Sequence, residues 1–285
     1  MYTPTFDYHR ATTLDEALSL LNDNPDAKVL AGGHSLIPAM KLRLANPGTL
    51  IDIGRVDDLK GISSANGSVT IGSLTTHAMI AASDQVPGGL AEAASMIGDP
   101  QVRNKGTIGG NVAHADPGSD LPTVLAALGA TFHIAGQGGE RSVSAADFFL
   151  SLMETSLAAG EILTAIEVPA EGAGTGSAYA KLASPASRYA MVCAAATVTV
   201  DGGSCSAVGV SIGGLTMIPL RASSVEEALM GASLDEGSIA AAADAVQNDL
   251  GDDLLSDIHA SADYRRAMAS VFVRYALSAA VERAG

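Results

Sequence analysis

Two glycine-rich turns carry the residues of this sequence that are best suited to hold a ligand. The first is the run AGGHS at residues 31–35, where a short apolar strand meets paired glycines and Ser35 can cap the helix that follows. The second is the run GTIGGN at residues 106–111. Glycines permit close approach of a ligand, and free N–H groups at a helix start attract phosphate. A lone Gly-Gly pair is more often an ordinary strand-to-helix turn, so neither turn is specific by itself.

The second turn lies in a stretch of about twenty residues with almost no large apolar side chain. A loop of this length without regular structure is usually functional or disordered. Thr107 and Asn111 bring hydroxyl and amide donors, and Asp116 and Asp120 bring acceptors for ribose hydroxyls or ring N–H groups. Two separate phosphate-binding turns, joined by such polar residues, predict a dinucleotide ligand.

Other nucleotide sites and metal sites find no support in the sequence. The Rossmann fingerprint needs G-x-G-x-x-G at a strand-to-helix turn with an acidic residue about 20 residues later, and neither turn has that spacing. The glycines at 136–139 and 172–174 are predicted to lie in plain surface turns. P-loop and HExxH metalloprotease patterns are absent. The two cysteines, Cys193 and Cys205, cannot supply the four ligands of a typical iron–sulfur cluster or structural zinc.

The composition is that of an acidic globular protein. Apolar residues make up 47% of the 285 residues and charged residues 16%, which provides for buried cores and excludes a disordered chain. The 16 basic and 31 acidic residues give a net charge of −15, which argues against nucleic acid and anionic membranes as partners. No apolar run approaches the ~20 residues of a membrane-spanning helix, and the N-terminus carries no secretion signal. A reducing cytoplasm is the expected compartment.

The spacing of apolar residues predicts an α+β chain in three parts, with boundaries near residues 56 and 173. The first part is a β-turn-α-β unit behind a short amphipathic helix that either of two threonines can cap. The glycine-rich stretch 170–178 links the middle part to three strands whose turns suggest a meander. Helices are predicted over 13–22, 36–44, 76–82, 89–97, 121–128, 145–150, 224–230, 238–250 and 263–283. Strands are predicted over 28–31, 49–53, 68–71, 131–135, 162–168, 178–182, 192–200 and 206–212.

The pair AGGHS and TIGGN, residues 107–111, resembles the two FAD-pyrophosphate motifs of the flavin subunits of molybdenum hydroxylases, the family that includes xanthine dehydrogenase. Within this family the chain is most similar to the medium subunits of aerobic carbon monoxide dehydrogenases. Five blocks in the family's order make the resemblance far more specific than either glycine motif. They are FDYHRATTLDEALSLL, LAGGHSLIPAMKLRLANPGTLIDI, IGDPQVRNKGTIGGNVAHADPGSDLP, GEILTAIEVP and AYAKLASPASRYAMVCAAA.

The resemblance implies a two-subdomain FAD-binding fold of the vanillyl-alcohol-oxidase (PCMH) type over residues 1–56 and 57–172. It implies a C-terminal α+β domain over 173–285, with a three-stranded sheet and helices, that helps cover the isoalloxazine ring. The implied protein is an oxidoreductase subunit without catalytic residues of its own, since the cofactor carries the chemistry. A molybdopterin-containing large subunit would oxidise the substrate, and a [2Fe–2S] small subunit would carry electrons to FAD.

An external acceptor such as a quinone would then take the electrons, with oxygen and NAD left open. The implied assembly is a dimer of heterotrimers in the cytoplasm, and association with the inner face of the membrane is left open.

The resemblance also implies which residues contact FAD. Backbone N–H groups of both glycine turns would face the pyrophosphate, Asn111 and Asp120 would lie along the adenosine–ribityl path, and Tyr189 would lie over the ring face. Lys181 would contact the flavin edge, beside the main chain of 162–163. The full expected set is Leu30, Ala31, Gly32, Gly33, His34, Ser35, Leu36, Thr76, Val102, Thr107, Ile108, Gly109, Gly110, Asn111, Asp116, Asp120, Ile162, Leu163, Lys181 and Tyr189.

Several of these residues have an ordinary structural alternative. Tyr189 could be a half-buried core tyrosine, Lys181 a solvated lysine, and His34 a contributor of backbone only. His77 and His114 are interpreted as packing or hydrogen-bonding residues.

Arg103 and Lys105 could offset phosphate charge or contact a partner subunit, and residues 99–100 read as a turn. Residues 187–188 are Ser-Arg where a smaller acidic pair is expected in the carbon monoxide enzymes, which leaves the substrate class open. The alternatives are a flavin subunit of a related xanthine, aldehyde or N-heterocycle dehydrogenase, and a flavin-free scaffold subunit.

Overall fold

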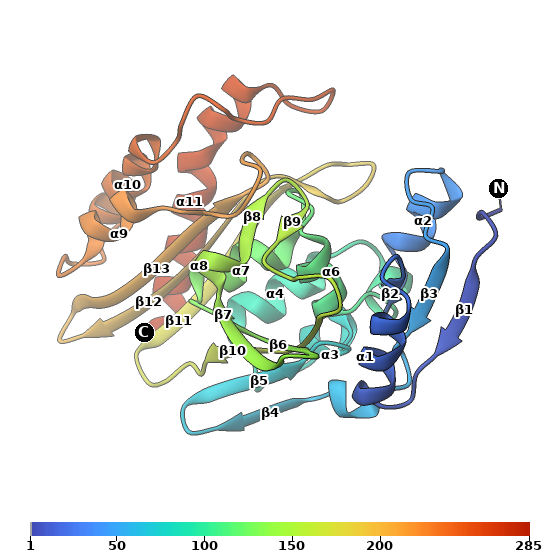
Figure 1. Ribbon diagram of the computed structural model, residues 1–285. Helices are drawn as coiled ribbons and strands as arrows, with labels where there is room; N and C mark the ends of the chain where they lie inside the picture. The colour runs from blue at the N-terminus through green and yellow to red at the C-terminus, as the bar shows by residue number, and fades with distance from the viewer. Residues whose placement is uncertain (1) are drawn as a thin grey trace.

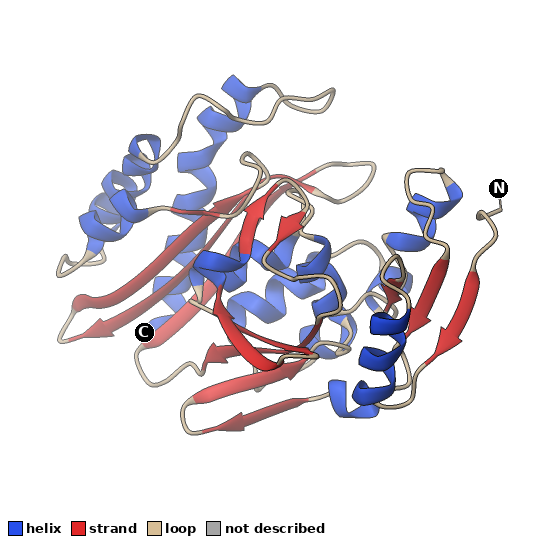
Figure 2. Cartoon of the chain, viewed as in Figure 1, coloured by secondary structure: helices blue, strands red, loops and turns tan. Residues whose placement is uncertain are grey.

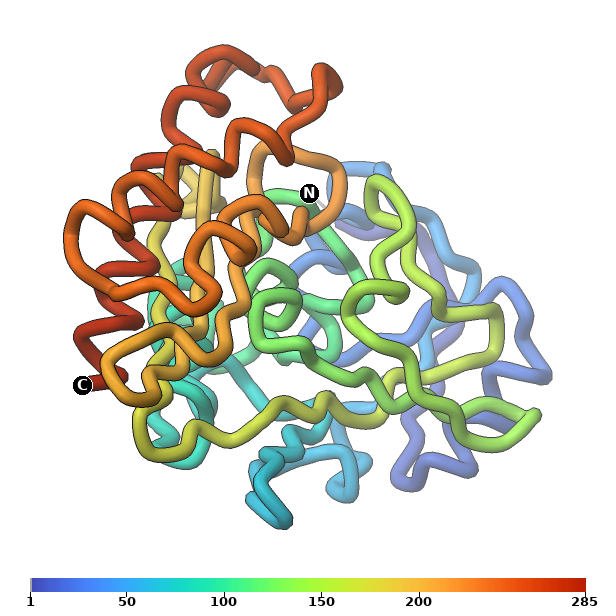
Figure 3. Tube along the Cα trace, turned by 90° about the vertical axis from the view of Figure 1, so that its left-hand side faces the viewer, coloured from blue at the N-terminus to red at the C-terminus, as the bar shows by residue number. Residues whose placement is uncertain are grey.

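The computed structural model describes residues 2–285, in which three larger β-sheets follow one another along the chain (Figures 1 and 2). A fourth sheet, of two strands, lies within the middle part. The N-terminal part and the C-terminal helices lie at opposite sides of the molecule, as the view turned by 90° also shows (Figure 3). The middle sheet and its helices lie between them. None of the helices within residues 2–285 is both long enough and apolar enough to span a membrane.

The first part is a three-stranded parallel sheet in the order β1-β3-β2, flanked by helices. Its elements are β1 (Asp7–Arg10), α1 (Leu14–Asp23), β2 (Lys28–Leu30), α2 (Leu36–Lys41), β3 (Thr49–Asp52) and the 3₁₀ turn Asp57–Leu59. The predicted β-turn-α-β unit is confirmed, and Thr13 caps α1 by accepting from the N–H of Glu16. β1 was not predicted because all four of its residues are exposed, so it lacks apolar alternation.

The middle part is built on a five-stranded antiparallel sheet in the order β4-β5-β10-β6-β7. The last strand in sequence, β10, thus lies at its centre. The elements are β4 (Ile62–Ala65), β5 (Ser68–Gly72), α3 (His77–Ala81), α4 (Gly88–Met96), α5 (Pro100–Arg103), α6 (Ile108–His114), α7 (Asp120–Ala127), β6 (Thr131–Gly136), β7 (Gly139–Ser144), α8 (Ala145–Phe148), β8 (Phe149–Ser151), β9 (Glu154–Thr155) and β10 (Ile162–Pro169).

The prediction of a long polar loop around the second glycine turn is wrong, because the helices α5, α6 and α7 lie in this region. The glycines at 109 and 110 lie in the first turn of α6, which Thr107 caps. Their low helix propensity hid this helix from sequence reasoning. The Asp99-Pro100 pair is likewise a helix start rather than a turn, because the carboxylate of Asp99 accepts hydrogen bonds from the N–H groups of residues 101 and 102.

The third part is an antiparallel sheet in the order β11-β12-β13-β14, with helices after it. Its elements are β11 (Thr175–Ala183), β12 (Ala190–Asp201), β13 (Ser204–Gly213), β14 (Leu220–Arg221), α9 (Ser223–Leu229), α10 (Glu236–Asp244), the 3₁₀ turn Ala245–Asn248 and α11 (Ala262–Ala284). The predicted meander is confirmed, but the sheet has four strands rather than three. The fourth, β14, has only two residues and is too short to show an alternating pattern.

Side chains alternate across the third sheet, so each of its faces joins a different core. Tyr179 and Cys193 belong to the core of the middle part, where α4 and α7 pack on the sheet. Ala178 and Ala194 belong to the opposite core, which α11 covers (Figure 1). A two-residue period therefore places one face of β11 and β12 against α4 and α7, which lie before and after the second glycine turn in the sequence.

The first and middle parts also share apolar contacts, because Leu74 and Ile162 pack with the core of the first sheet. The connections between the three sheets run over residues 53–61 and 170–174. The division into 1–56, 57–172 and 173–285 as separate domains stays a prediction.

Candidate functional site

The two glycine turns, far apart in the sequence, meet in the structure. A Cβ atom at Gly32 would lie 2.1 Å from the carbonyl oxygen of Lys105 and 3.0 Å from the Cα of Gly106. A Cβ atom at Gly110 would lie 3.8 Å from the Cβ of Ala31. The backbone approach at Gly32 is closer than any side chain allows, so this glycine joins the first part of the molecule to the second turn.

The first turn presents a cluster of free backbone donors. Within residues 2–285, none of the N–H groups of residues 32–35 donates a hydrogen bond to another backbone group. Gly33 has a φ of +76°, which bends the chain before α2 begins at Leu36. The expected cap is wrong: Ser35 stands at the N-cap position in a helical conformation, and its side chain makes no capping bond. Consecutive N–H groups without partners form a concavity suited to an anion.

Hydrogen bonds within the protein engage the second turn, which therefore offers fewer free N–H donors than expected. The N–H of Gly109 donates to the carbonyl of Ser73 at 2.8 Å, and the N–H of Gly110 donates to the Thr107 hydroxyl at 3.2 Å. A Cβ atom at Gly109 would lie 2.5 Å from that of Ser73, so packing requires this glycine. Contrary to expectation, these two N–H groups are engaged within the protein. The N–H of Thr107 has no backbone acceptor within residues 2–285.

Three buried polar atoms around the second turn have no hydrogen-bond partner within residues 2–285: Ser73 Oγ, His77 Nδ1 and Asn111 Oδ1. The amide nitrogen of Asn111 donates to the hydroxyl of Ser119 at 3.2 Å, so only its oxygen is left over. The packing role predicted for His77 agrees with its position, because a Cβ atom at Gly106 would lie 2.7 Å from its ring. Burial, together with the charges of His34 and Arg103, lowers the pKa of His77 to about 4.

Asp120 and Lys181 form a buried ion pair beside the second turn. The ammonium lies 2.7 Å from the carboxylate, and the two side chains are 3% and 6% exposed. The hydroxyl of Tyr179 donates to the same carboxylate oxygen at 2.6 Å. Burial raises the pKa of Asp120, and the Lys181 ammonium and the Tyr179 hydroxyl oppose that rise. The interpretation of Lys181 as a solvated lysine is therefore wrong.

Tyr189 lies beside Ser35 of the first turn and against Gly118 rather than in a core. It is 45% exposed, and its ring packs on the backbone of Gly118, where a Cβ atom would lie 2.9 Å from Cδ1. Partial burial and the charges of Asp116 and Asp120 raise the pKa of Tyr189, and the hydroxyl of Ser35 opposes the rise. The core alternative for Tyr189 is wrong, because an exposed loop between β11 and β12 carries this residue to the edge of the first turn.

The remaining predicted residues lie around or beneath the junction of the two glycine turns, where residues 31–32 meet residues 105–110. Thr76 caps α3, and its backbone bridges that of Thr107. Val102 accepts the N–H of Gly106 through its carbonyl at 2.7 Å. Ile162 and Leu163 are buried in β10 and belong to two different cores. The predicted set thus comes from all three parts of the chain.

Arg103 and Lys105 lie next to the second turn. The guanidinium of Arg103 donates to the carbonyls of Ile97 and Gly98, so much of its hydrogen-bonding capacity serves the structure.

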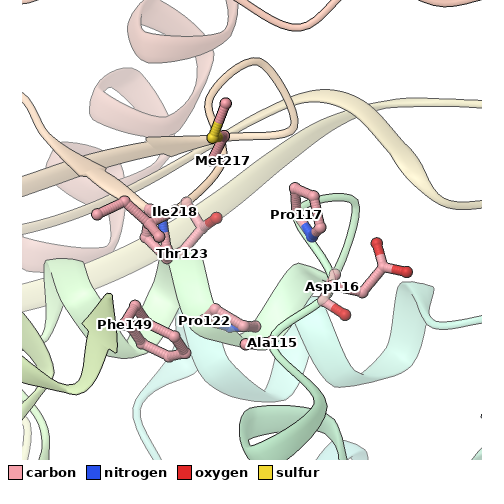
Figure 4. Close-up of a pocket in the computed structure, with 10 residues that line it drawn as sticks. Ala115, Asp116, Pro117, Pro122, Thr123, Phe149, Met217 and Ile218 are labelled. Atoms are coloured by element: carbon pink, nitrogen blue, oxygen red, sulfur yellow. The ribbon is translucent and has the colours of Figure 1, made fainter. Parts of the chain in front are cut away.

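Two cavities adjoin the loop 115–119, which follows α6. The larger, of about 190 Å³, is lined by Asp116, Tyr189, His259 and Arg265 among others. The smaller, of about 10 Å³, lies between α7, Phe149 and the loop that carries Met217 (Figure 4), and it has room for no more than one water molecule. Sequence reasoning missed the segment 255–265 beside Tyr189, because no motif marks it and only the fold brings it there.

Comparison with known proteins agrees with this architecture. The family described as "FAD binding domain in molybdopterin dehydrogenase" matches residues 4–171, and the "CO dehydrogenase flavoprotein C-terminal domain" matches residues 177–280. The carbon monoxide dehydrogenase medium chain of Afipia carboxidovorans is 38% identical over 100% of this chain and 99% of its own length.

Solved structures give the same result. Carbon monoxide dehydrogenase from Hydrogenophaga pseudoflava superimposes with a TM-score of 0.94 at 41% identity, covering 99% of each chain. Quinoline 2-oxidoreductase from Pseudomonas putida 86 superimposes with a TM-score of 0.91 at 34% identity, covering 100% of this chain and 99% of that one.

Fold and site define a flavin-binding oxidoreductase subunit. The chain belongs to the family of FAD-binding subunits of molybdopterin dehydrogenases, with the C-terminal domain of the carbon monoxide dehydrogenase flavoproteins.

The residues at the junction fit FAD. The free N–H groups of residues 32–35 are donors for a diphosphate, and the close approach at Gly32 keeps side chains out of that region. The unpartnered oxygen of Asn111 is an acceptor for a hydroxyl or ring N–H group. The resemblance stated from the sequence, and FAD as the family's cofactor, are therefore confirmed.

Proposed function

We propose that this chain is the FAD-binding medium subunit of a carbon monoxide dehydrogenase of the molybdenum type. The observation that carries the proposal is the meeting of the AGGHS turn with residues 105–110, which joins a cluster of free N–H donors to the helix start at Thr107. Full-length similarity to carbon monoxide dehydrogenase medium chains supports it.

In this proposal the chain binds and orients its cofactor and performs no acid–base chemistry. FAD, when bound, supplies the capacity to accept electrons singly and release them in pairs. The N–H groups of residues 32–35 and of Thr107 hold the diphosphate, and Asn111 and Asp116 stand where the polar part of the cofactor extends. Tyr189 covers the flavin site from the side of the third sheet. These roles rest on the proximity of all three parts of the chain at one junction.

The proposed partners are a molybdopterin-containing large subunit, which oxidises the substrate, and a small subunit with [2Fe–2S] clusters. A quinone or another external acceptor takes the electrons from FAD. The proposed assembly is a dimer of heterotrimers in the cytoplasm. The term "medium chain" in the names of the relatives supports a complex of chains of several sizes.

A second candidate is the flavin subunit of an N-heterocycle hydroxylase. It is supported by the 34% identity to quinoline 2-oxidoreductase and by Ser187-Arg188 beside Tyr189. The substrate pocket would lie on another subunit, so the two candidates differ in the partner subunit that this flavin subunit serves. The scaffold alternative is weaker, because a flavin-free subunit has no use for a cluster of unpaired N–H groups.

The test is to purify the native complex through a tag on this chain and to analyse its cofactors. We expect a flavin spectrum, FAD released by acid, and stoichiometric iron and molybdenum. Bleaching of the flavin band by carbon monoxide but not by quinoline would support the first candidate, and the reverse would support the second. A complex without flavin would contradict the FAD site and favour the scaffold alternative.

A matched pair of variants tests where the diphosphate lies. His34 is exposed and adjoins the free N–H groups, so His34→Asp places a carboxylate beside them, while His34→Asn has the same shape without the charge. We expect the Asp variant to bind FAD at least about tenfold more weakly than the Asn variant, which corresponds to about 1.4 kcal/mol. Titration of FAD into flavin-depleted complex measures this difference. Equal affinities would place the diphosphate elsewhere.

A further inference from the structure

The buried ammonium group of Lys181 makes three polar contacts within the protein. Besides its ion pair with Asp120 at 2.7 Å, it donates to the carbonyl of Met96 at 3.0 Å and to the carbonyl of Arg188 at 2.9 Å. An ammonium has three N–H donors, and these partners account for all three. The group therefore ties together the N-terminus of α7, the end of α4, strand β11 and the loop that follows that strand.

The carboxylate that faces this ammonium is itself fixed. Asp120 is the first residue of α7, and the buried hydroxyl of Tyr179 donates to the oxygen that Lys181 contacts. A buried ion pair is stabilised by this kind of additional hydrogen bond, and the loss of one partner leaves a costly isolated charge. Lys181 is thus held at one position on the inner side of the third sheet.

The bond to Arg188 fixes the segment that carries Tyr189. The loop 184–189 closes on itself, since the N–H of Ser184 donates to the carbonyl of Tyr189 at 2.8 Å and the N–H of Arg188 donates to that of Ser184 at 2.9 Å. Arg188 has a φ of +61°, an unfavourable conformation for this residue type. Its carbonyl belongs to the planar peptide group that contains the nitrogen of Tyr189, so Lys181 sets the plane from which the Tyr189 side chain departs.

We infer that Lys181 is a positioning residue: clamped by Asp120, its ammonium holds the Arg188 carbonyl and thereby keeps the Tyr189 ring against Gly118 at the flavin site. The inference rests on the proposed FAD site. It differs from the expectation that Lys181 contacts the flavin edge directly, because the three protein acceptors already occupy its donors. Lys181 acts on the flavin through Tyr189.

A double-mutant cycle in the purified holo-complex separates these two roles. Lys181→Met, Tyr189→Ala and the combination of both are compared with wild type, and Lys28→Met serves as an exposed-lysine control. The readouts are FAD content, the visible circular dichroism of the flavin, and quenching of its fluorescence by iodide, which reports how well the ring face is covered. Neither optical readout responds to a loss of stability in a complex that stays folded.

We expect Lys181→Met to raise the iodide quenching constant severalfold and to change the flavin dichroism as Tyr189→Ala does, with FAD still bound. The combined variant should show no further change. Additive effects would mean that Lys181 contacts the flavin itself, and an unchanged signal in Lys181→Met would mean that it does not position Tyr189. Either result would overturn the inference. Absence of FAD from the wild-type complex would instead overturn the proposed function.

The single variant leaves Asp120 buried without its partner, so a neutral version guards against misfolding. Asp120→Asn combined with Lys181→Met removes both charges and is carried through the same cycle with Tyr189→Ala. Non-additivity is again the expected result. Failure of the neutral pair to assemble would assign the ion pair to stability and would overturn the inference.

Discussion

His77 shows how a single buried residue can support the second glycine turn. The ring of His77 occupies the space that a side chain at residue 106 would need, and the backbone N–H of His77 donates to the carbonyl of Gly106 at 3.1 Å. The residue is 3% exposed, and its Nδ1 has no protein partner within residues 2–285. A buried ring in this place resists protonation, because the charged form would lose its hydration. The second glycine turn therefore packs against a neutral histidine side chain.

This neutrality predicts a pH dependence of stability. The unfolded chain protonates His77 near pH 6.5, whereas the folded chain does so only near pH 4. Between these values the unfolded state binds more protons, so the free energy of unfolding falls as the pH falls from 6.5 to 4. The loss from this residue is on the order of 3 kcal/mol. Urea unfolding of the full chain at several pH values measures it.

Two variants isolate this contribution. His77→Asn should flatten the profile over this range, and His9→Asn, at an exposed position, should retain the wild-type profile. Equal pH dependence in all three proteins would show that His77 is not the group responsible.

At the scale of elements, small residues decide how closely helices approach the third sheet. A Cβ atom at Gly176 in β11 would lie 2.4 Å from the carbonyl of Ala280 and 2.6 Å from the nitrogen of Ala284 in α11. Helix and strand thus touch through their backbones at this point. The same strand, β11, carries Lys181 and Tyr179 on the opposite side, toward α7. The packing of α11 and the Asp120–Lys181 ion pair therefore both depend on β11.

We expect Gly176→Ala to lower the free energy of unfolding by about 1–3 kcal/mol, because the new methyl group must displace the backbone of α11. Gly172→Ala is the matched control, since nothing lies within 4 Å of its Cβ position and no left-handed φ is required there. The control should be neutral or slightly stabilising. Calorimetry of both variants measures the difference, and similar stabilities would contradict the proposed contact.

At the scale of the whole molecule, the site depends on how the first part sits on the middle part. The close approach of Gly32 to the Lys105 carbonyl sets this relation, and the core shared through Ile162 and Leu74 supports it. No local element contains the complete site. Donors from the first part, the helix start of the second turn and Tyr189 from the third part become neighbours only when all three sheets are packed.

Replacing Gly32 by alanine should therefore abolish or strongly reduce FAD binding without any added charge. A methyl group 2.1 Å from a carbonyl oxygen forces the two turns apart, since backbone cannot move as a flexible side chain does. Gly48→Ala, which has open space at the Cβ position, should bind FAD normally. The measurement is FAD per complex after gel filtration, with circular dichroism to show that both variants fold. Full occupancy in Gly32→Ala would refute this role.

Short sequence patterns were enough to predict several features of the fold and the family. Thr13 and the leucines after it specify α1, alternation and turn residues specify the β11–β13 meander, and the two glycine motifs in one order identify the flavin family. Each helix, strand or motif among these is a local pattern of residues close together in the chain, although the two glycine motifs themselves lie far apart.

Packing of distant parts of the chain set the remaining features. It made a helix of the glycines at 109 and 110, because packing against Ser73 and the Thr107 cap outweigh their poor helix propensity. It buried Lys181 against Asp120, although a lysine near an exposed loop resembles a solvated one in sequence. It also brought Gly32 to Lys105 and Tyr189 to Gly118. These contacts join residues distant in the chain, and no local pattern encodes them, because their free energy arises only when the sheets pack.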